Sequence, residues 1–128
     1  MGDVYNEISQ ALTKLTEIHS ARVHEYDMVL GVFDGVGYNL TFMNANDKNV
    51  KHHHETYDAT LCFVFGKGKV LVKDAYFEYS GGSCLKVPRN TMHQIICETD
   101  TLMITIQDPA TTFTEKGWGD IVFDEPLF

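Results

Sequence analysis

The chain has 128 residues, enough for one domain with a single well-buried core and too few for two. Hydrophobic residues make up 44% and aromatic residues 12%, which is typical of a globular protein and argues against a disordered one. The formal net charge is −8, and lysine and arginine form no cluster. Because such a surface repels phosphate groups, we expect neither nucleic acid nor a membrane as a partner.

No apolar run approaches the roughly 20 residues that a membrane-spanning helix needs. The first residues lack the basic start and apolar stretch of a signal peptide. The three cysteines (Cys62, Cys84 and Cys97) form no Cys-x-x-Cys motif, and an odd number leaves one without a disulfide. Cys62 and Cys84 lie in strand-like apolar runs, so we expect buried thiols rather than a bridge. These features predict a cytoplasmic protein.

The first predicted element is an amphipathic helix over residues 3–20, for which Asp3 is a suitable N-cap. Apolar side chains recur there every three or four residues, which places them on one face of a helix: Val4, Ile8, Ala11, Leu15 and Ile18. This face would pack against the rest of the domain or against a second subunit, and the sequence leaves both alternatives open.

Residues 23–110 are predicted to form a β-barrel. Short runs rich in β-branched and aromatic residues alternate with turns of glycine, asparagine and aspartate, and no helical pattern intervenes. The predicted strands are 28–33, 38–43, 60–65, 69–72, 75–79, 85–87, 94–97 and 102–106. Many short strands at regular spacing indicate an antiparallel sandwich or barrel. Residues 111–128 form a predicted C-terminal extension, so that 1–128 is a single domain.

The histidines at 52–54 carry the strongest chemical signal. Side chains of an extended strand alternate between two faces, so His52 and His54 share a face and His53 points the other way. His93, on a later strand, completes a set of three imidazoles if the two strands are neighbours. Three imidazoles on facing strands are typical of a transition-metal site. The alternative is that His52 and His54 are surface residues where a polar loop meets a strand.

The region from 46 to 93 resembles the two sequence motifs of the cupin superfamily. The first motif reads glycine, five residues, His-x-His, three or four residues, glutamate, six residues, glycine. His52, His54 and Gly66 stand at the spacing of its four-residue form. Asn46 replaces the first glycine, which is a mild change because asparagine tolerates the left-handed backbone region better than most residues.

The second motif reads glycine, five residues, Pro-x-Gly, two residues, histidine. Gly82, Pro88 and His93 fall in register with it, and Asn90 replaces its second glycine. The glutamate of the first motif, which is a metal ligand in the family, falls on Ala59 in the four-residue form. The resemblance therefore supplies three histidines without the carboxylate.

The resemblance implies a cupin-like jelly-roll β-barrel. Together with the helix that the apolar spacing predicts, the expected fold is mainly β, a cupin-like jelly-roll β-barrel preceded by one N-terminal amphipathic α-helix. It also implies a metal held by His52, His54 and His93, and a homodimer, since cupin barrels commonly dimerise. Neutral imidazole suits iron, zinc and nickel, whereas magnesium and manganese prefer carboxylate oxygen. Three neutral ligands leave the metal positive, which favours anionic or chelating oxygen donors in its remaining positions.

Other residues near the motifs are candidates for a supporting role. Glu55 or Asp58 could curl in as a fourth ligand, although both also fit an acidic loop, and in the four-residue form Asp58 points away from the interior. His53 could face solvent, hydrogen-bond to a ligand, or replace one of its neighbours as a ligand. Polar side chains that could line the cavity, or else be ordinary barrel residues, are Tyr38, Tyr57 and Gln107.

Three functions fit these residues. The first is a metal-dependent enzyme that acts on a small polar or anionic metabolite inside the barrel. Dioxygenase-like chemistry is the most compatible, because three-histidine cupins include iron-dependent dioxygenases and the metal has room for a bidentate substrate and O₂. The second is a non-oxidative sugar or keto-acid isomerase or lyase, with the metal as a Lewis acid. The third is a non-catalytic ligand-binding cupin, because loss of a ligand is an expected result of lost catalysis.

Overall fold

The computed structural model describes residues 25–111, 113–114, 117–118 and 121–124. The helix predicted over 3–20 and part of the extension at 111–128 lie outside these residues. The strands of the described part are β1 (Tyr26–Phe33), β2 (Val36–Met43), β3 (His52–His54), β4 (Asp58–Phe65), β5 (Gly68–Val72), β6 (Ala75–Tyr79), β7 (Cys84–Val87), β8 (His93–Cys97), β9 (Thr101–Asp108), β10 (Phe113–Thr114), β11 (Gly117–Trp118) and β12 (Ile121–Phe123).

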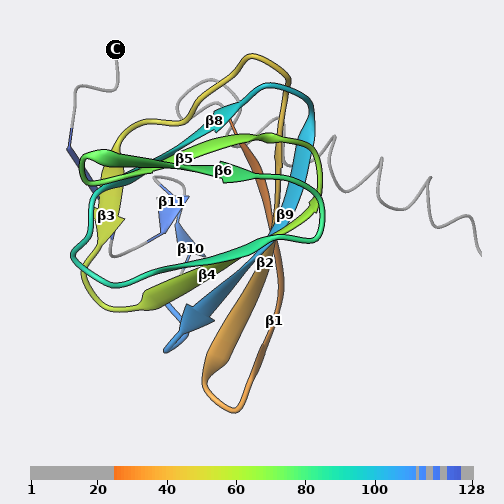
Figure 1. The fold of residues 1–128 in the computed structure, drawn as a ribbon. Helices are drawn as coiled ribbons and strands as arrows, with labels where there is room; N and C mark the ends of the chain where they lie inside the picture. The colour runs from red at the N-terminus through yellow and green to blue at the C-terminus, as the bar shows by residue number, and fades with distance from the viewer. Residues whose placement is uncertain (1–24, 112, 115–116, 119–120, 125–128) are drawn as a thin grey trace, which may run out of the picture.

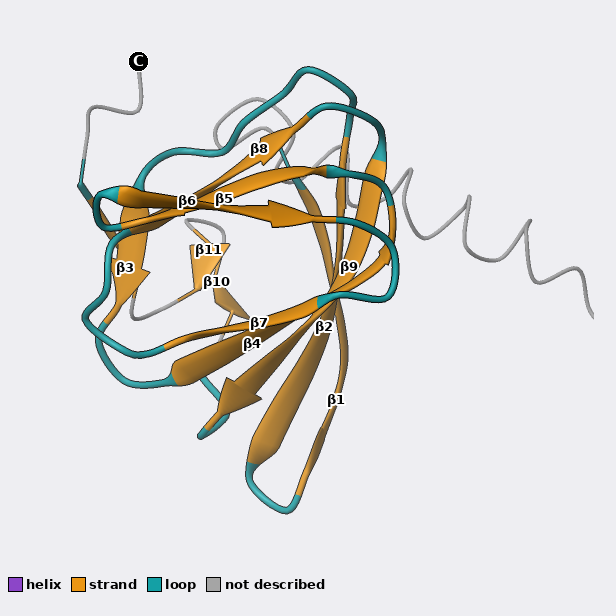
Figure 2. Cartoon of the chain, viewed as in Figure 1, coloured by secondary structure: helices purple, strands orange, loops and turns teal. Residues whose placement is uncertain are grey.

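Ten of these strands make two antiparallel sheets of five that lie one over the other (Figure 1). The first sheet has the order β1-β2-β9-β4-β7, the second has the order β12-β3-β8-β5-β6, and β10 and β11 pair with each other. Figure 2 shows only strands, loops and turns in the described part. The prediction of an antiparallel sandwich or barrel is confirmed. No helix within the described residues is long and apolar enough to cross a membrane.

The two sheets enclose the core because their side chains alternate between an inner and an outer face. In β2 every second residue is buried, and β9 follows the same period. Leu61, Phe63 and Val70 belong to the apolar core between the sheets. The inner faces of β2 and β9 also bury polar side chains, such as Asn39 and Gln107. The interior is therefore partly polar, which suits a binding cavity more than a purely structural core.

The eight strands predicted from the sequence are all present, with ends displaced by at most two residues. The strand at 75–79 has the predicted bounds. The strands outside that predicted list, β3, β10, β11 and β12, contain only two or three residues each. A run that short has no measurable alternation, so its pairing depends on the partner strand.

Four motif positions adopt a left-handed backbone. Asn46 and Asn90 have φ angles of 65° and 59°, as expected for asparagines that stand where the motifs have glycine. Gly66 has a φ of 103°, and a Cβ atom there would lie 2.5 Å from the carbonyl oxygen of Asp100. Gly82 has a φ of 93°. The motif positions therefore also set the backbone geometry of turns.

The cysteine prediction is partly wrong. The described chain contains no disulfide, but Cys84 is exposed and Cys62 is only half-buried, whereas both were expected to be buried. The reason is the period of β4, whose inner face carries Ala59, Leu61 and Phe63 and leaves Cys62 on the outer face. Cys97 is buried.

Part of the C-terminal extension belongs to the second sheet. Strand β12 pairs antiparallel with β3, with Phe123 opposite His52 and Ile121 opposite His54. Asp124, just after β12, lies 2.9 Å from Nδ1 of His53. The strand that carries two of the candidate ligands is therefore flanked on both sides, by β12 and by β8.

Candidate metal centre

Three buried histidines from two neighbouring strands meet inside the barrel. His52 and His54 come from β3, and His93 begins β8, where it is the direct partner of His52. The ring centroids are 4.3 Å apart for His52 and His93, 5.1 Å for His52 and His54, and 5.7 Å for His54 and His93. One nitrogen from each ring lies within 4.8 Å of the other two. The sequence expectation for these three residues therefore matches their placement.

This spacing fits one transition-metal ion. Two imidazole nitrogens that each lie about 2.1 Å from a metal can be at most about 4.2 Å apart. The observed limit of 4.8 Å is only slightly larger, so small side-chain movements would bring all three nitrogens onto one ion. Neutral nitrogen donors of this kind suit iron, zinc and nickel.

Backbone carbonyl groups hold two of the rings in position. Nδ1 of His52 donates to the carbonyl oxygen of Val50 at 2.6 Å, and Nδ1 of His93 donates to that of Thr91 at 3.1 Å. A carbonyl oxygen can only accept, so the proton of each neutral ring is on Nδ1 and the lone pair is on Nε2. A hydrogen bond of this type orients a metal-binding imidazole and fixes its tautomer.

Burial favours the neutral forms of His52 and His93. Loss of solvent, followed by the neighbouring His93 and His54, lowers the pKa of His52 well below its usual range. Burial is also the main cause that lowers the pKa of His93 to about 4, against the hydrogen bond to the Thr91 carbonyl, which raises it. A metal competes with protons for the same nitrogens, so a low pKa favours metal binding at neutral pH.

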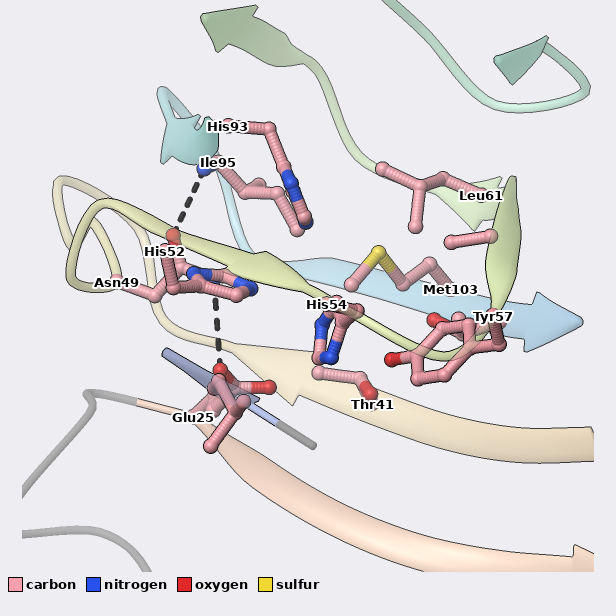
Figure 3. A pocket seen from close by; sticks show the side chains of 13 residues that line it. Glu25, Thr41, Asn49, His52, His54, Tyr57, Leu61, His93, Ile95 and Met103 are labelled. Carbon is pink, nitrogen blue, oxygen red and sulfur yellow. Dashed lines mark hydrogen bonds between the residues drawn. The ribbon is translucent and has the colours of Figure 1, made fainter. Parts of the chain in front are cut away.

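The histidines line a narrow cavity of about 40 Å³ (Figure 3). This is room for roughly three water molecules. The other polar residues of its wall are Glu25, Thr41, Asn49, Tyr57 and Thr105. The apolar residues of its wall are Ala59, Leu61, Ile95, Met103 and Ile121. The cavity therefore offers three imidazoles, other polar groups and apolar side chains to a bound ligand.

Ala59 is buried and lines this cavity, so the position of the family glutamate faces the site but offers no carboxylate. A different carboxyl group is present. Glu25, which precedes β1, lines the same cavity, and in Figure 3 its side chain points toward His52 and Asn49. Its Oε1 accepts a hydrogen bond of 3.4 Å from Nδ2 of Asn49.

Glu25 belongs to a hydrogen-bond network that also includes β8, the strand on which His93 lies. The backbone N–H of Ile95 donates to Oδ1 of Asn49 at 2.8 Å, and Nε2 of Gln94 donates to the Asn49 carbonyl at 2.7 Å. Loss of solvent, then the negative charge of Asp27, raises the pKa of Glu25 well above its usual range. The cavity wall therefore carries a carboxyl group with a strong tendency to keep its proton.

Sequence reasoning missed Glu25, because it belongs to neither motif. A signal was present, since Glu25 and Asp27 alternate with Tyr26 and Met28 just where the first strand begins. Two acidic residues in the period of one strand face indicate that this face is either solvated or part of a polar site.

The other candidate ligands, Asp58, Glu55 and His53, do not line the cavity. Asp58 accepts hydrogen bonds from the backbone N–H and Nε of Arg89, at 2.9 Å and 3.3 Å, and this contact lowers the pKa of its carboxyl group. Glu55 is exposed. His53 points away from the other histidines and pairs with Asp124. None of the three lies where it could bind the same ion as His52.

The structure separates the three polar candidates for the cavity wall. Tyr57 lines the cavity and is almost fully buried, with its ring centroid 4.3 Å from that of His54. Tyr38 instead packs against Phe33, with centroids 5.9 Å apart. Gln107 is buried beside Ala59 on the neighbouring strand and does not line the cavity. Its Nε2 has no hydrogen-bond partner in the described part of the structure.

Comparisons with known proteins agree with this fold. No family model matches the sequence, and no curated protein matches it. Among solved structures, KdgF from Halomonas sp. is 20% identical with a TM-score of 0.63, covering 68% of this chain and 80% of that one. A cupin superfamily protein from Desulfitobacterium hafniense is 19% identical with a TM-score of 0.58, covering 65% and 75%.

Salicylate 1,2-dioxygenase from Pseudoaminobacter salicylatoxidans is 13% identical with a TM-score of 0.69, covering 83% of this chain and 32% of that one. The chain thus spans about a third of the length of that enzyme. At such identities the likeness concerns the fold. The chain has the cupin fold, as the two sequence motifs predicted, and it carries a three-histidine cluster inside the barrel.

Proposed function

We propose that this chain is a metal-dependent cupin enzyme that acts on a small polar metabolite inside the barrel. The observation that carries the proposal is the cluster of His52, His54 and His93, with nitrogens within 4.8 Å of one another. These residues would hold iron, zinc or nickel, and the ion would supply Lewis-acid chemistry or, as iron, reactivity with O₂. The narrow cavity supports a small substrate.

Dioxygenase-like chemistry is the form of this proposal that we favour. Three neutral histidines occupy only part of the coordination sphere of iron, so positions remain for a bidentate substrate and for O₂. The likeness in fold to a salicylate dioxygenase supports this choice. The apolar wall at Leu61, Ile95 and Met103 would exclude bulk water from the reacting groups.

A non-oxidative isomerase or lyase is the second candidate, and Glu25 favours it. Such a reaction needs a group that moves a proton, beside a metal that polarises a carbonyl group. Glu25 lines the cavity without belonging to the histidine cluster, and its carboxyl group could take or give that proton. Tyr57 is the other titratable side chain of the wall that could do so.

Metal analysis of the purified protein tests the proposal. We expect near-stoichiometric iron, zinc or nickel in the wild type and none in a His52→Ala/His93→Ala variant. His53→Ala is the matched control, because His53 lies on the same strand and points away from the cluster. Absence of metal from the wild type, even after incubation with each ion, would leave a binding barrel whose histidines contact a ligand directly.

The identity of the bound metal then indicates which of the two reactions to assay. Oxygen uptake by the iron-loaded protein with catechols, diketones or thiol acids would support the dioxygenase. Turnover of a sugar or keto acid by the zinc-loaded protein without oxygen would support the isomerase or lyase. The Glu25→Gln variant also distinguishes the two reactions. We expect it to lose much more rate in the isomerase or lyase reaction, because that reaction needs a group that moves a proton.

We also propose a homodimer, supported by apolar side chains on the first hairpin. Val29, Leu30, Val32 and Phe33 are between 47% and 68% exposed, and the β1–β2 hairpin extends beyond the body of the barrel in Figure 1. An apolar cluster of this kind often marks an interface between subunits. Sedimentation of the wild type and of Phe33→Asp tests this, with dimer and monomer as the expected species.

A further inference from the structure

A pair of cysteines lies on the outer face of the first sheet, away from the histidine cavity. Cys62 on β4 and Cys84 on β7 are direct partners in the antiparallel register, and their Sγ atoms are 3.0 Å apart. Both sulfurs are free thiols. Two thiols this close on neighbouring strands are already positioned to form a disulfide bond.

The register favours a bond between them. The next pair along the strands is hydrogen-bonded, because the backbone N–H of Phe63 donates to the carbonyl oxygen of Ser83 at 2.9 Å. Hydrogen-bonded and non-hydrogen-bonded pairs alternate in an antiparallel ladder, so Cys62 and Cys84 form a non-hydrogen-bonded pair. Such pairs have Cα atoms about 4.5 Å apart, which is within the range that a disulfide spans.

The two thiols differ in access. Cys84 is exposed, and Cys62 is half-buried beside it. Burial, followed by the neighbouring Cys84, raises the pKa of Cys62 to about 11, so its thiol is protonated at neutral pH. An external reagent therefore meets Cys84 first, and Cys62 is placed to react second. Cys97 is buried and belongs to the core cluster between the sheets.

We propose that Cys62 and Cys84 form a reversible modification site, which an oxidised low-molecular-weight disulfide converts to an intramolecular bridge. The thiolate of Cys84 attacks one sulfur of the reagent, which releases one small thiolate and leaves a mixed disulfide on Cys84. Cys62 then attacks the Cys84 sulfur, loses its proton to solvent and expels the second small thiolate. The protein loses two electrons and two protons, and the reagent gains them to become two thiols.

Oxidised glutathione is the probe that tests the proposal on the folded protein. We expect the intact mass to fall by about 2 Da, with one free thiol left of the three in the sequence. Tryptic peptides 52–67 and 74–86 should be joined, and dithiothreitol should restore both. Cys97→Ser should form the same bridge with the same loss of mass and keep no free thiol, whereas Cys84→Ser should show neither the bridge nor the loss of mass.

The proposal is overturned if the protein stays fully reduced, or carries only glutathione on Cys84, under conditions in which iodoacetamide alkylates Cys84. A bridge that joins two molecules, or that includes Cys97, would also overturn it. Cys62→Ser keeps the test valid if Cys84→Ser fails to fold, since it removes the resolving thiol and should stop at the mixed disulfide. The result does not depend on metal in the barrel.

Discussion

His52 and His93 face each other directly across β3 and β8, with their ring centroids 4.3 Å apart and their Nδ1 atoms each bonded to a carbonyl oxygen two residues earlier. Strand pairing and two local hydrogen bonds thus orient both rings before any ligand is present. Such preorganisation reduces the conformational entropy that the two side chains would lose when a metal binds.

Removal of a single ligand should greatly weaken metal binding. We expect His93→Gln to lower the affinity for zinc by more than about 100-fold, because loss of a first ligand should exceed the 10–100-fold cost known for outer partners. Competition with a chromogenic chelator measures this. His53→Gln should change the affinity by less than about threefold, since His53 pairs with Asp124 outside the cavity. Equal losses in both variants would contradict the assignment.

A carboxylate introduced at position 59 should strengthen the site. Ala59 lines the cavity, so Ala59→Glu should raise zinc or manganese affinity by about 10-fold or more, because a charged oxygen joins three neutral nitrogens. The same variant should have a lower melting temperature without metal, since it buries an uncompensated charge. Thr60→Glu is the matched control, because it adds the same charge on the opposite face of β4. Equal behaviour of the two variants would show that position 59 does not face the metal.

Acid should destabilise the metal-free protein through His93. The pKa of His93 is about 4 in the folded chain and about 6.5 in the unfolded chain. Between these values the unfolded chain binds a proton that the folded chain does not. The free energy of unfolding therefore falls as the pH falls from about 6.5 toward 4, by roughly 3 kcal/mol at most for this group. Urea unfolding at pH 7.5 and 4.5 should show a larger loss for the wild type than for His93→Gln.

Glu25 should act on stability in the opposite direction. Its pKa is raised in the folded chain, so between the unfolded value of about 4.3 and the folded value the folded chain binds more protons. Its contribution is present at low pH and is lost as the pH rises through the folded pKa. In metal-free protein, Glu25→Gln should therefore lose less stability than the wild type between pH 5 and pH 8. Parallel pH profiles from urea unfolding would contradict the burial of this carboxyl group.

Strand positions and the histidine set follow from local patterns. Alternation and turn residues predict the eight longer strands, and the spacing of the two motifs predicts that His52, His54 and His93 converge. The same spacing places Ala59 in the cavity wall. These predictions succeed because side-chain direction in a strand depends only on its period of two.

Other features depend on the pairing of distant strands. The alternation of Glu25 and Asp27 indicates a polar strand face, but it does not show that Glu25 meets a cavity built by β3 and β8, because that contact comes from the packing of one sheet over the other. The sequence carries no sign that Cys62 and Cys84 would face each other on the exposed side, because an apolar run does not show which of its faces is outside. Local period fixes the relative faces of residues along one strand, whereas register and sheet packing decide which residues meet.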